Sequence, residues 1–128
     1  MTWHRSVVAD ALVQALKAND DGTTNIFPSP PMTLNPPAIA VGRPTEVRYG
    51  VAGFGVDQVE LPVICIGPME GDDMVDGLIA FVRTVVMGNA TLDHVVQTCQ
   101  AESQRNWRAL RIGGADYLAA DVVLAIEQ

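Results

Sequence analysis

A pair of glycines near the end of the chain constrains the fold more than any other feature of the sequence. Gly113 and Gly114 separate two segments rich in apolar side chains, residues 105–112 and 115–126. Two glycines supply the positive backbone angles of a two-residue turn, so the pair predicts an antiparallel hairpin. Such a turn also sets the register. The predicted cross-strand pairs are Ile112–Ala115, Arg111–Asp116, Leu110–Tyr117 and Trp107–Ala120.

Both faces of this hairpin are predicted to carry apolar side chains. We assign the face with Trp107 to the core of the protein itself, together with Ala109, Leu118, Ala120 and Val122. Two helices shield only one face of a small sheet, so we expect the other face to pack against another subunit. The candidate residues of this subunit interface are Leu110, Ile112, Tyr117, Val123, Arg108 and, from a separate loop, Phe54.

Two segments have the apolar spacing of amphipathic helices. In residues 3–17 the apolar side chains include Val8, Leu12 and Leu16, and in residues 72–87 they include Val75, Ile79 and Val82. Aspartates in the first turns of the second segment favour a helix start, because they complement the positive end of the helix dipole. A third, short helix is predicted over residues 92–100.

The segments between the helices favour strands and irregular chain. Prolines and turn-forming residues predict an irregular connection over 19–37. Residues 38–41, 46–49 and 56–66 are predicted strands, and Pro62 places the last of them at a sheet edge or a bulge. The Gly50–Gly55 loop around Phe54 is expected to be mobile in the free protein and to order against a neighbour. The predicted class is α+β, a mostly antiparallel sheet with a C-terminal hairpin, covered on one face by the N-terminal and central helices.

Composition indicates an ordinary single domain spanning residues 1–128. The chain is 48% hydrophobic and 18% charged, and its uninterrupted apolar runs are far too short to span a bilayer. The first twenty residues lack the pattern of a signal peptide, so we expect the protein to stay in the cytoplasm where it is made. Cys65 and Cys99 are too few for a disulfide framework and are expected to be reduced.

Charge is both negative overall and unevenly distributed. The net charge of -7 opposes stable binding of nucleic acid. Residues 57–76 contain six acids and no base, whereas residues 105–111 contain three arginines and no acid. Two interpretations remain open, namely head-to-tail association of subunits through opposite patches, and an internal network of salt bridges.

The sequence predicts no catalytic, metal-binding or cofactor-binding residue, and therefore no enzyme. His4 and His94 lie at neither ligand nor triad spacing from a cysteine, serine or carboxylate. The glycines around Phe54 follow neither phosphate-binding motif. The acids Glu70, Asp72, Asp73 and Asp76 do not have the spacing of a calcium loop, and a solvated helix start explains them better.

In the order of these segments the chain resembles the tail terminator family of long-tailed bacteriophages, whose members are also described as minor tail or tail completion proteins. The resemblance covers nearly the whole chain. It rests on the first helix, Asn25–Pro28 leading into Pro36–Gly42, a strand ending Leu61–Gly67, the central helix, and Gly113–Ala120. None of these segments is a catalytic motif.

The resemblance implies a structural virion protein with no cofactor. It would form a ring, usually hexameric, that caps the head-proximal end of the tail tube, ends its polymerisation and joins the head connector. The implied partners are further copies of the chain, the tail tube protein and the connector, with DNA passing through unbound. It would be assembled in the host cytoplasm and reside at the head–tail junction of the virion. The alternatives are another neck protein, such as a head–tail connector or head-closure protein, and a small cytoplasmic α+β enzyme or ligand-binding domain.

Overall fold

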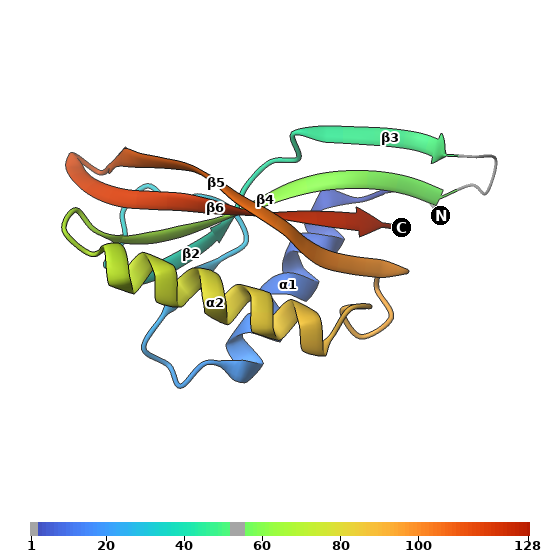
Figure 1. Cartoon of the computed structure of the whole chain (residues 1–128), viewed down its shortest axis with the longest axis horizontal. Coiled ribbons are helices and arrows are strands. Elements are labelled where there is room, and N and C mark those ends of the chain that lie inside the picture. The colour runs from blue at the N-terminus through green and yellow to red at the C-terminus, as the bar shows by residue number, and fades with distance from the viewer. Residues whose placement is uncertain (1–2, 52–55) are drawn as a thin grey trace.

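Within the residues that it describes, a computed structural model shows two helices and a six-stranded, mostly antiparallel sheet (Figure 1). The structure describes residues 3–51 and 56–128. Its elements are α1 (Arg5–Asn19), β1 (Asn25–Phe27), β2 (Ala38–Val41), β3 (Glu46–Val51), β4 (Val56–Pro68), α2 (Asp72–Gly88), β5 (Thr98–Ile112) and β6 (Ala115–Glu127). The predicted α+β class is confirmed.

The centre of the sheet is β4, and this corrects the placement of Pro62 at an edge or a bulge. The strand order is β1-β2-β4-β6-β5, and β3 also pairs with β4, beyond the end of β2. A proline is tolerated here because its missing N–H faces the break between β2 and β3. The Pro62 carbonyl points to the same side, where it accepts a hydrogen bond from the backbone N–H of Gly42 at 2.9 Å.

The main core lies between one face of the sheet and the two helices, as predicted. Alternate residues of β4 and β6, such as Val63 and Val122, point into it and meet Leu12 of α1 and Val82 of α2. Helix α2 packs across β4, β6 and β5, whereas α1 packs on β1 and β2. The period-two pattern of the strands and the helical pattern of α1 and α2 therefore meet in one layer of apolar side chains.

The connection 19–37 is more ordered than predicted. Residues 25–27 form β1, which pairs in parallel with β2, and residues 28–37, which we call the strap, run over the sheet face opposite the helices. The guanidinium of Arg5 holds the start of the strap by donating to the Pro28 and Val41 carbonyls, at 2.9 Å each. Leu34 of the strap is buried in a second apolar cluster, and its carbonyl accepts a hydrogen bond from the Tyr117 hydroxyl at 3.0 Å.

The C-terminal hairpin has the predicted turn and, near it, the predicted register. Gly113 and Gly114 have φ of 59° and 83°, and the pairs Ile112–Ala115, Arg111–Asp116 and Leu110–Tyr117 all occur. Farther from the turn the expected Trp107–Ala120 pair is wrong. The register shifts between Arg105 and Arg108, where Asn106 has φ of 61°, because a bulge inserts an extra residue.

The predicted third helix over residues 92–100 is also wrong. Leu92, Asp93 and His94 have φ of 48°, 57° and 70°, which a right-handed helix does not allow. The Asn89 side chain stabilises this turn, since its carbonyl accepts from the Asp93 backbone N–H at 3.0 Å. The chain then enters β5 at Thr98, seven residues before the predicted start at Arg105.

Candidate functional site: two surfaces of the sheet

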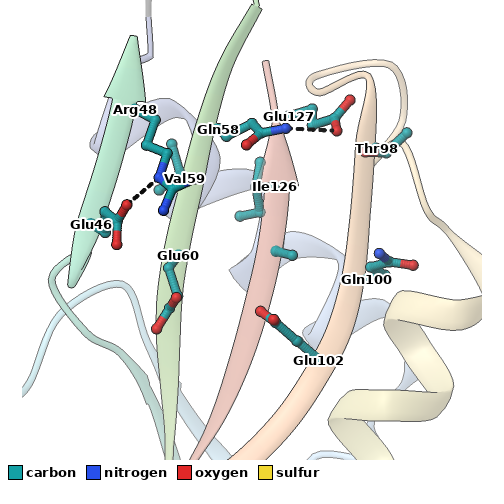
Figure 2. A pocket seen from close by; sticks show the side chains of 11 residues that line it. Glu46, Arg48, Gln58, Val59, Glu60, Thr98, Gln100, Glu102, Ile126 and Glu127 are labelled. Carbon is teal, nitrogen blue, oxygen red and sulfur yellow. Dashed lines mark hydrogen bonds and ion pairs between the residues drawn. The ribbon is translucent and has the colours of Figure 1, made fainter. Parts of the chain in front are cut away.

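The sheet face opposite the helices contains an acidic hollow. Its volume is about 350 Å³, and β3, β4, β6 and the start of β5 line it (Figure 2). Four glutamates and a single arginine stand around it, over a floor that includes Ala125. The lining residues used below are Glu46, Arg48, Gln58, Glu60, Glu102 and Glu127.

Only part of the negative charge of the hollow is compensated by the chain itself. Arg48 forms an ion pair with Glu46, and Arg105, just outside the hollow, lies 3.2 Å from Glu60. The pairing between Arg48 and Glu46 raises the pKa of the Arg48 guanidinium, so this arginine stays charged. Among the described residues, neither Glu102 nor Glu127 forms an ion pair. The hollow therefore presents net negative charge, suited to a cationic partner.

The three arginines of the hairpin each have an acidic partner in the same chain. Arg105 pairs with Glu60 as described, Arg108 lies 3.1 Å from Asp121, and Arg111 lies 3.4 Å from Asp116. Of the two interpretations of the charge pattern, internal salt bridges are thus present, and one of them, Arg105–Glu60, joins the acidic segment to the basic one. The Arg111 pair is well exposed, and exposed pairs of this kind contribute little stability, so Arg111 can exchange its partner at small cost.

The residues predicted for the subunit interface do not form one open surface. Leu110, Ile112 and Tyr117 are partly buried against the cluster that contains Leu34 of the strap, so the chain covers much of this face itself. Val123 is buried in the sheet, and Arg108 is half-buried beside Asp121. Phe54 lies outside the described residues. The expectation that this face has no cover of its own is therefore wrong around the strap, while the interface assignment stays a prediction.

Trp107, assigned above to the core, is instead an exposed residue. The residue is 42% exposed, and its indole N–H donates to the Gln104 side chain at 3.3 Å. The bulge at Asn106 takes Trp107 out of the regular ladder. With Ala109 and Arg111, which follow at every second residue and are also exposed, it makes a surface that we call the outer strip.

Asp57 is a structural residue that the charge pattern did not identify. It was counted within the acidic segment, but it is buried, and its carboxylate accepts backbone N–H groups of Trp3 at 3.1 Å and Gly50 at 3.2 Å. A signal was present in the sequence, since Asp57 has the same strand parity as Val59 and Leu61 and so falls on the core side. Its role is to join the start of the chain to the end of β3.

The groups that were weighed for chemistry do not converge. Cys65 and Cys99 are free and buried, and burial raises the pKa of each thiol to about 12. His4 and His94 are both exposed and lie in separate segments. In residues 3–51 and 56–128 no group of three or more histidine, cysteine or acidic side chains is arranged to hold a metal ion. No helix in the same residues is long and apolar enough to cross a membrane.

Comparison with known proteins finds no protein-family model that matches the chain and no matching curated protein.

Proposed function

We propose that the chain is a structural subunit of a ring that caps the head-proximal end of a bacteriophage tail tube, a protein of the tail terminator type. One observation carries the proposal. The molecule has two surfaces of complementary chemistry, the outer strip of the hairpin and the acidic hollow. The turn of the hairpin and the C-terminal end of β6 beside the hollow lie at opposite ends of its longest axis (Figure 1). Two different surfaces of complementary chemistry support head-to-tail contacts, which close into a ring when the rotation between neighbours allows it.

The acidic character of the chain supports a place around DNA. A net charge of -7 disfavours stable contact with phosphates, so a ring of such subunits lets DNA pass without holding it. The proposed protein has no cofactor, and its partners are further copies of itself, the tail tube protein and the head connector. Its location is the head–tail junction of the virion.

Deletion of the gene from the phage tests this function and separates it from the neck-protein alternative. A protein that ends tube polymerisation leaves tails of uncontrolled length when it is missing. A head-closure or connector protein leaves tails of normal length that do not join heads. Electron microscopy of the lysate distinguishes the two, and normal particles containing no copy of the chain would refute both.

The hollow also makes the ligand-binding alternative testable. A metabolite that enters the hollow and binds the folded chain must raise the melting temperature as its concentration rises. A thermal screen with small cationic metabolites on the wild-type chain and on Glu102→Gln, which removes one uncompensated charge of the hollow, addresses this reading. A shift present only in the wild type would favour a binding domain over a tail protein.

A further inference from the structure

The segment Ser103–Gly114 has the densest positive charge of the chain. It contains three arginines and no acid, whereas the rest of the chain contains five bases and all fifteen acids. Two copies of a chain with a net charge of -7 repel each other over most relative orientations. Approach through this segment lowers that repulsion, because its arginines offset the acidic side chains beside them, Glu60, Asp121 and Asp116.

Within this segment the outer strip has the composition of an interface anchor. Trp107 is 42% exposed and Arg111 has 69% of its side chain exposed, with the small Ala109 between them. Tryptophan and arginine are the residue types enriched at the energetic centres of protein interfaces. No strand among residues 3–51 and 56–128 pairs with the outer edge of β5, so the backbone beside the strip is open as well.

The complementary surface is the acidic hollow, which includes the start of the same strand β5. Glu102 and Glu127 stand at its rim without an ionic partner among the described residues, and Ala125 gives its floor an apolar part. A volume of about 350 Å³ is large enough to take in protruding side chains of a neighbour. Figure 2 shows that the side chains of Glu46, Gln100 and Glu102 stand on the same open face of the sheet.

We propose that the outer strip of one subunit docks into the acidic hollow of a second copy of the chain, with Trp107 as the anchor and Arg111 facing Glu102. This inference rests on the proposed function, because it specifies the contact between neighbours in the ring. The contact is heterologous, so each subunit uses its strip toward one neighbour and its hollow toward the other.

A cysteine cross-link in assembled tails tests the contact. The variant Arg111→Cys with Glu102→Cys carries one new thiol on each surface, and the native thiols of Cys65 and Cys99 are buried. Mild oxidation of tails should give a ladder of covalent multimers up to the full ring. Each single variant should give no multimer beyond a dimer, because a chain with one exposed thiol forms one bond.

A charge exchange provides the second measurement. Arg111→Glu alone should reduce incorporation into tails by about tenfold or more, since it puts a negative charge next to the hollow, and adding Glu102→Arg should restore it. Melting of the free variants shows whether each one folds. If the wild-type chain is in tails but neither ladder nor restoration occurs, the contact is wrong and the proposed function stands. If the wild-type chain is absent from tails, both fail.

Discussion

Tyr117 and Trp107 are predicted to respond in opposite ways to the same substitution, lysine at either position. Tyr117 packs in the cluster with Leu34 and its hydroxyl donates to the Leu34 carbonyl, whereas Trp107 is 42% exposed and bonds only to an exposed glutamine. Tyr117→Lys therefore loses packing, leaves the carbonyl of the buried Leu34 without its donor and brings a charge to an apolar cluster. Trp107→Lys changes a surface side chain.

The expected cost for Tyr117→Lys is about 3 kcal/mol, from the lost hydrogen bond and the cost of placing a charge near the cluster. For a chain of this length that lowers the melting temperature by roughly 10 °C. Trp107→Lys should cost less than about 1 kcal/mol and should reduce incorporation into tails. The control Tyr117→Phe keeps the ring and loses only the hydrogen bond, for about 1 kcal/mol.

Thermal melting of the purified variants, followed by measurement of their incorporation into tails, tests these expected differences. The reasoning is refuted if Trp107→Lys melts early while Tyr117→Lys melts like the wild type. That result would mean that Trp107 belongs to the core and that the strap does not hold the hairpin in solution.

Three further predictions concern stability. Asp57→Asn should cost roughly 2 kcal/mol, because its carboxylate accepts two backbone N–H groups, and hydrogen exchange at both amides should quicken; unchanged exchange would contradict this. In denaturant unfolding, Gly113→Ala should destabilise the protein more than Gly114→Ala. Both glycines have positive φ, but a Cβ at Gly113 would lie 3.0 Å from a strap carbonyl, whereas a Cβ at Gly114 would meet no atom within 4 Å. Equal losses would show that the strap is not in contact. With folded thiol pKa values of about 12 against an ordinary value near 9, the unfolded chain ionises Cys65 and Cys99 first. The free energy of unfolding of the wild type should thus fall as pH rises from about 9 to 12. The double variant Cys65→Ala with Cys99→Ala should show a shallower fall. An equal slope in the wild type and the double variant would exclude the thiols as the cause.

Local sequence patterns predicted the elements that depend on a turn sequence or on a periodic spacing of apolar residues. The glycine pair gave the turn and the register next to it, because a two-residue turn leaves little choice of pairing. The apolar spacing of α1 and α2 identified both helices and the side that each one buries. The strand predicted over residues 56–66 is also present, as part of β4.

The features that the sequence did not predict depend on contacts between distant segments. The bulge at Asn106 inserts one extra residue into β5. No local signal marks it except the tolerance of asparagine for positive φ. Leu34 lies among prolines, where no periodicity reveals that it covers the hairpin. Missing both features inverted the exposure expected for Trp107 and Tyr117. The acidic hollow combines β3, β4, β5 and β6, so it required the topology of the sheet.

The strap has a geometric consequence for an assembly built from this fold. It is held at one end by Arg5 of α1 and near the other by Tyr117 of the hairpin, so it braces the hairpin against the helical layer. If the hairpin reaches into the next subunit, the angle of the hairpin relative to the body is the angle through which each copy turns from its neighbour. A closed ring requires equal turns that sum to a full circle, so this angle sets the number of subunits. The stiffness of the brace then determines how closely every copy keeps the same angle. Loosening it, as Tyr117→Phe does, should broaden the distribution of ring sizes before it unfolds any subunit.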